Sequence, residues 1–225
     1  MPRSARFVLP GYPHHVVQRG NRRQQTFFEP DDYAFYIDLL GKACCDFRVK
    51  CWAWCLMPNH VHLVLEPSQA QDLALALKRT HQVYARHINA RMGWAGCLWQ
   101  GRFGASVMDE GHALAAVRYI ELNPVRARLV GRAEDWAWSS ARGHVWGDAD
   151  PLVSDIPFLR RIPDWRTYLS EGVDPEIEAR IGYFTETGHP MGEEDWVGAL
   201  EVKSGRVLRP RPRGRPASKV PDGEI

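Results

Sequence analysis

Hydrophobic and polar residues recur along the first half of the chain with the spacings of both strands and helices. Short apolar or alternating stretches predict strands at 14–19, 49–56, from His60 onward and at 103–108. Apolar residues three and four apart predict helices from Pro30 onward, at 72–91 and at 111–122. The order of these elements predicts an α+β protein with a ferredoxin-like split βαβ antiparallel sheet and one added helix.

The predicted topology gives the two faces of the sheet different covers. The first two helices cover one face, which leaves the third helix free to approach the other. The strand at 49–56 is apolar throughout, so we expect both of its faces to be covered. Regular alternation places Trp52 and Trp54 on one face and Cys51, Ala53 and Cys55 on the opposite face.

Two histidines share one face of the strand that follows the turn at Pro58 and Asn59. Side chains alternate along a strand, so His60 and His62 stand side by side while Val61 points to the other face. Two imidazoles can bind one divalent cation, but an open catalytic site needs a third protein ligand from elsewhere. The alternative is that the pair only makes hydrogen bonds within a polar surface.

The third helix carries candidates for the missing groups. Tyr119 and Asn123 are four residues apart, so on a helix they lie on the same side and offer a hydroxyl and an amide oxygen together. Pro124 cannot continue the helix without losing a hydrogen bond, so Asn123 is alternatively the N-cap of a new helix. Tyr84 competes with Tyr119 as a nucleophile, but its place in an apolar stripe favours packing.

Three ordered motifs resemble those of a known family. They are Met57-Pro58-Asn59-His60-Val61-His62, Leu98-Trp99-Gln100-Gly101-Arg102-Phe103 and Tyr119-Ile120-Glu121-Leu122-Asn123-Pro124-Val125-Arg126-Ala127. Together they resemble the REP-associated tyrosine transposases, which belong to the single-tyrosine (Y1) HUH superfamily of single-strand DNA transposases. The resemblance spans residues 6–146.

The resemblance implies a metal-dependent endonuclease and strand transferase that acts on single-stranded, hairpin-forming palindromes through a 5′-phosphotyrosine intermediate. Within it, Tyr119 matches the nucleophile, His60 and His62 match the metal ligands, and Asn123 stands where relatives have a third ligand. The implied cofactor is Mg²⁺ or Mn²⁺. The resemblance also implies a monomer, although insertion-sequence relatives work as homodimers that exchange the tyrosine helix.

Basic and aromatic residues around the motifs are candidates for DNA contacts. We expect Trp99 to stack on an unpaired base, and we expect contacts to phosphates or bases from Arg19, Arg22, Arg23, Gln100 and Arg102. Basic residues recur without a carboxylate from Lys203 to Lys219, which predicts a flexible tail. Its Arg213-Gly214-Arg215 resembles an AT-hook core, and the alternative is a solvated tail that adds sequence-independent affinity.

Composition sets the limits of this interpretation. The 225 residues are 44% hydrophobic and carry a formal net charge of +2, so binding to DNA has to rest on where the charges lie. We expect a catalytic domain at 1–146, a helical appendage at 147–202 and a basic tail at 203–225.

Apolar runs are too short to span a membrane, which predicts a cytoplasmic, nucleoid-associated protein. Five cysteines without regular spacing predict reduced thiols, with Cys51 and Cys55 more typical of small core residues than of a zinc pair.

Two other functions remain open from the residues alone. One is a nucleic-acid-binding protein that keeps the fold without catalysis, such as a repressor that binds hairpins. The other is a zinc hydrolase built on His60 and His62, which lacks a general-base carboxylate near the pair, since Glu66 shares their side of the strand but lies at its end.

Overall fold

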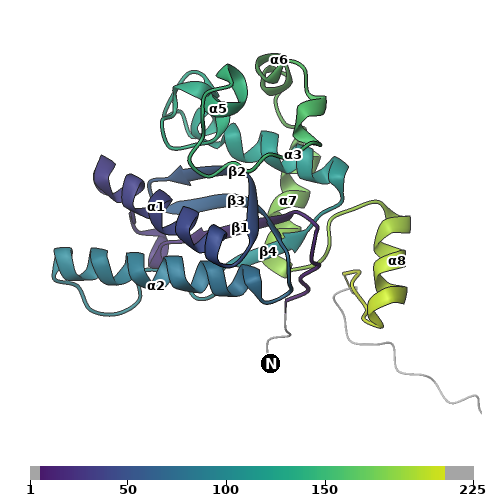
Figure 1. The fold of residues 1–225 in the computed structure, drawn as a ribbon, viewed down its shortest axis with the longest axis horizontal. Coiled ribbons are helices and arrows are strands. Elements are labelled where there is room, and N and C mark those ends of the chain that lie inside the picture. The colour runs from purple at the N-terminus through teal and green to yellow at the C-terminus, as the bar shows by residue number, and fades with distance from the viewer. Residues whose placement is uncertain (1–5, 211–225) are drawn as a thin grey trace, which may run out of the picture.

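A computed structural model describes residues 6–210 of the chain. In this part of the chain, four antiparallel strands form one sheet in the order β2-β3-β1-β4. The strands are β1 (His14–Arg19), β2 (Val49–Met57), β3 (His60–Pro67) and β4 (Gly104–Val107). This is the strand order of a split βαβ sheet, so the predicted α+β, ferredoxin-like class is confirmed (Figure 1).

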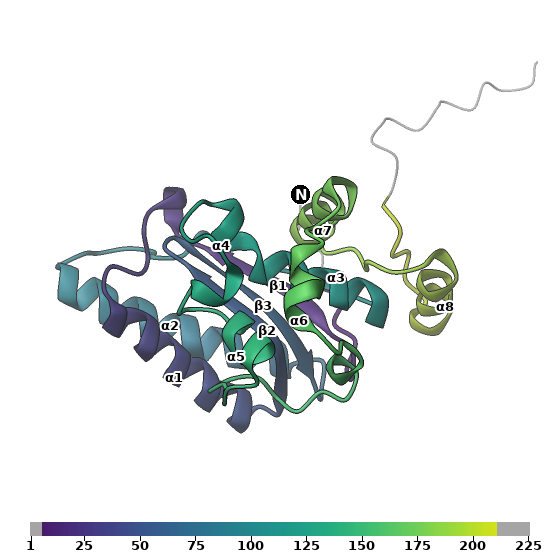
Figure 2. The same ribbon diagram turned by 90° about the horizontal axis from the view of Figure 1, so that it is seen from above.

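Helices α1 (Pro30–Asp46) and α2 (Asp72–Met92) lie together on one face of the sheet (Figures 1 and 2). Proline at the first turn of α1 and a capping box between Glu29 and Asp32 explain why that helix begins where it does. Buried Val16 and Leu63 face these helices from the central strands. This face therefore holds the main hydrophobic core.

Helices α3 (Glu110–Glu121) and α7 (Pro175–Thr187) cover the other face. Helix α3 packs mainly on β2, and α7 packs on β4 and β1. A kink at Leu122 separates α3 from the short helix α4 (Asn123–Arg126). The N-cap of α4 is thus Leu122, one residue before the N-cap that the sequence suggested.

Strand β2 departs from regular alternation. The pairing of β2 with β3 shifts register between Cys51 and Ala53, which marks a β-bulge. The extra residue turns Trp52 to the α3 side of the sheet, whereas Trp54 stays on the α1 side. The prediction that both tryptophans share a face was therefore wrong.

The segment after α4 contains short helices that pack back on the body. They are α5 (Ala141–Trp146), α6 (Trp165–Ser170) and the 3-10 helices Ala133–Asp135 and Leu159–Arg161. A further 3-10 helix, Asn21–Arg23, lies elsewhere in the fold, directly after β1. Residues 138–140 pair with the edge of β2, since Trp138 O accepts from Leu56 N at 2.9 Å and Ser140 N donates to Trp54 O at 2.9 Å. This segment closes the edge of the core.

The longest helices of the C-terminal region are α7 and α8 (Glu194–Ser204), which hydrophobic spacing alone did not predict. The start of the predicted basic tail is folded on α8: Arg209 bonds Glu201 at 3.0 Å, and Leu208 is buried. Arg213 and Arg215 lie outside the described residues. Within residues 6–210, no helix is both long enough and apolar enough to cross a membrane.

Candidate active site

The predicted histidine pair lies on the α3 side of the sheet. His60 and His62 are on β3, their rings meet edge to face with centroids 4.8 Å apart, and His62 is only 4% exposed. Their side of the strand is fixed because Val61 and Leu63 fill the core under the opposite face. Neither Nε2 atom has a hydrogen-bond partner among the described residues.

Asn59 holds the ring of His60. The Asn59 amide donates from Nδ2 to the carbonyl of Arg23 at 3.0 Å, which turns its Oδ1 toward His60 Nδ1 at 2.6 Å. Because Oδ1 only accepts, His60 Nδ1 carries the proton. The lone pair of His60 is therefore on Nε2.

His15 is a third histidine at this place, and sequence reasoning missed it. It pairs with Val64 across β1 and β3, which makes it the diagonal neighbour of His62 on the same face. The two rings are parallel within 8°, and His15 Nε2 is 3.0 Å from His62 Nδ1. On its other side, His15 Nδ1 is 2.7 Å from the hydroxyl of Thr185 in α7. The neighbouring histidines at 14 and 15 were visible in the sequence, but only the strand register shows which one joins the site.

Tyr119 lies against the histidines, as predicted. Its ring meets His62 edge to face with centroids 5.7 Å apart, and meets His15 in the same way at 5.9 Å. The guanidinium of Arg126, one turn past the kink, lies 4.9 Å from the centre of the Tyr119 ring. The phenol of Tyr119 thus contacts the imidazoles of His15 and His62 and the guanidinium of Arg126, all within one chain.

Asn123 contacts Arg126 beside Tyr119, but its amide makes few hydrogen bonds. Its Oδ1 accepts a long hydrogen bond of 3.4 Å from Arg126, and its Nδ2 is buried without a partner. Arg126 is held in turn by an ion pair with Glu178 of α7. The amide oxygen therefore makes only one long hydrogen bond among the described residues.

Burial keeps the histidines neutral. Burial lowers the pKa of His60 to about 4, and the positive charge of Arg19 acts in the same direction. Burial also lowers the pKa of His62 well below its usual range, and that of His15 to about 3. Neutral imidazoles are the form that binds metal ions, and these histidines are in that form at neutral pH.

The polar residues that we predicted to contact DNA lie together at the end of β1. Arg19 pairs with His60 across the sheet, and the Arg19 carbonyl accepts from the backbone of exposed Gln100 at 2.7 Å. Arg22 and Arg23 are exposed and have left-handed backbone angles, with φ of 53° and 61°. Non-glycine residues in this region are strained, and such strain often marks functional loops. Arg102, also exposed, follows two residues after Gln100.

Trp99 does not lie on this surface. It is 8% exposed and packs among Tyr36, His81 and Tyr84, with its Nε1 donating to the carbonyl of His81 at 3.2 Å. The face that we expected to stack on a base is covered by protein. Packing therefore replaces base stacking as its role.

The competing chemical groups are engaged elsewhere. Tyr84 is fully buried and donates to the carbonyl of Thr26 at 2.7 Å. Glu66 bonds Lys50 and Trp52 at 2.9 and 3.0 Å, so it is not free to act as a general base beside the histidines.

The remaining metal candidates do not form a site of their own. Burial raises the pKa of the Cys51 and Cys55 thiols, as expected of core cysteines. Among residues 6–210, no three His, Cys, Asp or Glu side chains are grouped to hold a metal ion. A metal bound by His60 and His62 therefore needs a ligand of another kind, such as the Asn123 amide.

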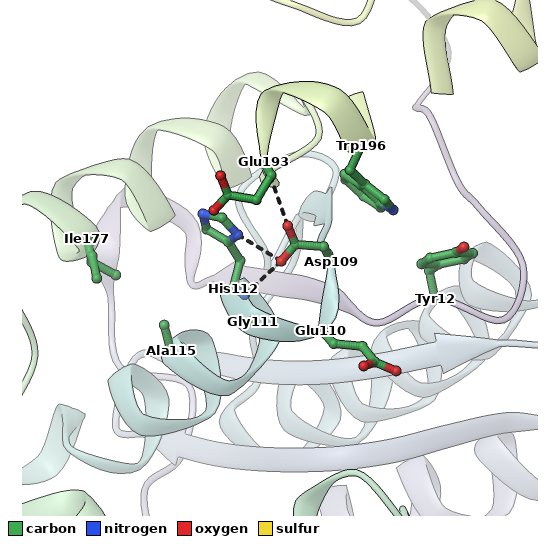
Figure 3. Close-up of a pocket in the computed structure, with 9 residues that line it drawn as sticks. All are labelled: Tyr12, Asp109, Glu110, Gly111, His112, Ala115, Ile177, Glu193 and Trp196. Carbon is green, nitrogen blue, oxygen red and sulfur yellow. Dashed lines mark hydrogen bonds and ion pairs between the residues drawn. The ribbon is translucent and has the colours of Figure 1, made fainter. Parts of the chain in front are cut away.

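A separate hollow of about 590 Å³ opens at the start of α3 (Figure 3). The Asp109 carboxylate accepts from His112 and from the backbone of Glu193 inside it, and the rings of Tyr12 and Trp196 flank it. Its lining includes neither the histidine pair nor Tyr119. Its acidic character makes it unsuitable for a phosphate group.

Comparison with known proteins identifies the family of this chain. The family model of IS200-like transposases matches residues 10–123. Among solved structures, a REP-associated tyrosine transposase bound to a REP hairpin is similar over 70% of this chain and 96% of its own, with 22% identity and a TM-score of 0.55.

A candidate transposase from Deinococcus radiodurans R1 covers 57% of this chain and 92% of its own, with 17% identity and a TM-score of 0.37. No curated protein matches. The family model covers just over half of the chain and reaches from β1 to Asn123, so it contains both histidines and the tyrosine. The chain therefore belongs to the IS200-like transposase family, a family of enzymes that cut and join DNA.

Proposed function

We propose that this protein is a metal-dependent single-strand DNA endonuclease and strand transferase that acts on hairpin DNA through a 5′-phosphotyrosine intermediate. The observation that carries the proposal is the edge-on contact of Tyr119 with His62, with 5.7 Å between ring centroids. A nucleophile and a metal ligand have to be this close to act on one phosphate.

The residues of the site fit a divalent cation. His60 offers an unprotonated Nε2 atom, the Nε2 atom of His62 has no hydrogen-bond partner among the described residues, and Asn123 offers an amide oxygen that accepts only one 3.4 Å hydrogen bond. These three residues would hold Mg²⁺ or Mn²⁺, and their neutrality would leave the full charge of the ion for phosphate. When bound, the ion supplies Lewis-acid stabilisation of the phosphate oxygens and of the leaving 3′ oxygen.

Tyr119 supplies the covalent step. Its hydroxyl oxygen forms a bond to phosphorus as the bond to the 3′ oxygen breaks, and the 3′ oxygen leaves as a hydroxyl. The 5′ end of the downstream strand then remains on the tyrosine. Because the phenolate is a good leaving group, a 3′-hydroxyl reverses the reaction and joins the strands without another energy source. Arg126, 4.9 Å from the ring centre, favours the negative charge that develops there.

The polar surface at the end of β1 supports a path for the strand. Arg19, Arg22 and Arg23 lie next to His60, and Gln100 and Arg102 border them. We assign their contacts to phosphates and exposed bases, which would lead an unpaired strand toward the site. The hairpin in the similar solved structure supports a folded palindrome as the substrate class.

We further propose that one chain is sufficient for catalysis. Tyr119 reaches the histidines of its own chain, so no exchange of α3 with a second copy is needed to assemble the site. This arrangement favours a monomer over the exchanged homodimer.

A strand-specific label tests the proposed reaction. The substrate is a pool of DNA hairpins with randomised single-stranded flanks, labelled at either the 5′ or the 3′ end and incubated with Mn²⁺. The proposal predicts that a 3′ label stays with the protein in a denaturing gel, whereas a 5′ label is released on a shorter oligonucleotide. Hairpins retained only in a native gel, with neither end cut, would instead identify a binding protein without catalysis.

A further inference from the structure

We propose that Thr185 and His15 are positioning residues that hold His62 in the tautomer whose unprotonated Nε2 faces the cation site. This inference rests on the proposed function for its purpose, since it assigns His62 as a metal ligand. It adds a residue from α7, a helix that lies outside the part of the chain matched by the family model.

A continuous line of hydrogen bonds connects α7 with His62. The hydroxyl of Thr185 is 2.7 Å from the carbonyl oxygen of Ile181 and 2.7 Å from His15 Nδ1. His15 Nε2 is 3.0 Å from His62 Nδ1. The line thus runs from the backbone of α7, through β1, to β3.

The carbonyl at one end fixes the direction of every proton in the line. A carbonyl only accepts, so the single hydroxyl proton of Thr185 is donated to Ile181. The hydroxyl oxygen must then accept from His15, which places a proton on His15 Nδ1. His15 Nε2 is left as an acceptor, so His62 donates from Nδ1 and keeps its lone pair on Nε2.

The buried surroundings of His15 and Thr185 disfavour any other arrangement of protons in this line. His15 and Thr185 are 1% and 4% exposed, and no carboxylate is hydrogen-bonded to His15 or His62 among the described residues. A buried imidazolium without a counter-ion is costly, so each ring has only one proton to place. With the opposite tautomer of His15, Nε2–H would donate to His62 and the proton of His62 would face the cation.

Helix α7 is packed closely enough to keep this line in register. Gly104 of β4 lies under Thr185, and a Cβ atom at Gly104 would be 2.8 Å from the Thr185 carbonyl oxygen. Only glycine permits so close an approach of helix and strand. The same arrangement serves His60, whose tautomer is fixed by Asn59 and the Arg23 carbonyl. The tautomers of both proposed metal ligands are therefore determined by backbone carbonyls, which act through an intermediate side chain or chain of side chains, as is common around metal sites.

The test uses metal-free protein first, and then Mn²⁺ alone. Nitrogen-15 NMR of the imidazole rings reports which nitrogen of His62 is protonated, and calorimetry reports the dissociation constant for Mn²⁺. Thr185→Val keeps the branched shape but removes the hydroxyl, and Thr185→Ser is the matched variant that keeps it. We expect Thr185→Val to lose the single His62 tautomer and to bind Mn²⁺ about 10 to 100 times more weakly, while Thr185→Ser stays near wild type.

Several results would overturn the inference. One is a wild-type protein in which His62 Nε2 carries the proton; this measurement needs no variant to fold. Another is a folded Thr185→Val protein with the wild-type tautomer and Mn²⁺ affinity. Neither readout uses DNA, so failure of the proposed cleavage would leave the tautomers as expected. Conversely, a protein that cleaves DNA with the opposite His62 tautomer would contradict only this inference.

Discussion

The Tyr119 ring meets the edge of His62 at 81°, with 5.7 Å between the ring centroids. The contact joins the last turn of α3 to β3 of the same chain. If one chain builds the whole site, two differently inactivated copies cannot repair each other.

We therefore expect a mixture of the Tyr119→Phe and His62→Ala proteins to form no covalent adduct with hairpin DNA. The amount of adduct is measured on a denaturing gel after the two proteins are unfolded and refolded together, so that any exchange of helices can occur. Restored adduct at a quarter or more of the wild-type level would show that the tyrosine acts on the site of a partner.

Loss of either imidazole removes a proposed metal ligand. We expect His60→Ala and His62→Ala to weaken Mn²⁺ binding more than about 100-fold, beyond the effect usual for an outer partner of a metal ligand. Calorimetric titration with Mn²⁺ measures this change. His87→Ala is the matched control because His87 is exposed on α2, on the other side of the sheet. Equal Mn²⁺ affinity in all three variants would place the metal elsewhere.

A buried ion pair behind the tyrosine helix makes stability depend on pH. His144 Nδ1 lies 2.6 Å from Oε1 of Glu121, which is fully buried at the end of α3 and also accepts from Ser140 at 2.5 Å. Burial alone would lower the pKa of His144, but the charge and hydrogen bond of Glu121 outweigh it and raise the pKa above 6.5.

The sign of the effect follows from that shift. A raised pKa in the folded state stabilises the protein fully below pH 6.5, and this contribution is lost as the pH rises through the folded-state value. We expect His144→Gln to cost about 1.5–3 kcal/mol of unfolding free energy at pH 6 and clearly less at pH 9, measured by urea unfolding. A cost that is equal at the two pH values would contradict the charged pair.

The basic C-terminal segment is expected to add affinity but no chemistry. Truncation after Pro210 keeps Leu208 and Arg209 packed on α8 and removes Arg213 and Arg215. We expect the truncated protein to bind the hairpin more weakly. We also expect the slope of log K against log salt to become shallower, by about 0.7 for each single-strand phosphate that the segment neutralises in the full chain. Adduct formation at saturating protein should persist. An unchanged salt slope, measured by fluorescence anisotropy, would exclude the segment from binding.

Local sequence patterns predicted the parts of the site that lie on one element. The two-residue period of β3 was enough to place His60 beside His62. The four-residue spacing of Tyr119 and Asn123 was a weaker guide, because α3 ends before Asn123 and that residue begins α4. Strand order then brought α3 to the histidine face, as the split βαβ pattern predicted.

Features that depend on register or on distant segments were not predictable in this way. His15 joins the site only because β1 pairs with β3 in one particular register. The bulge in β2, which separates Trp52 from Trp54, leaves no mark in the apolar pattern. Asp174 and Pro175 are a typical helix start and were a usable signal for α7, but no local pattern connects Thr185 with a strand 170 residues earlier.

The most direct test of the account is whether the covalent link depends on one hydroxyl. Tyr119→Phe removes that hydroxyl, and Tyr183→Phe is the matched control because Tyr183 is exposed on α7. With labelled hairpin DNA and Mn²⁺, we expect the wild type and Tyr183→Phe to form an adduct that survives denaturation. Tyr119→Phe should form none, while its affinity for the hairpin stays within about threefold, or less than 1 kcal/mol. A covalent adduct that persists in Tyr119→Phe would contradict the account.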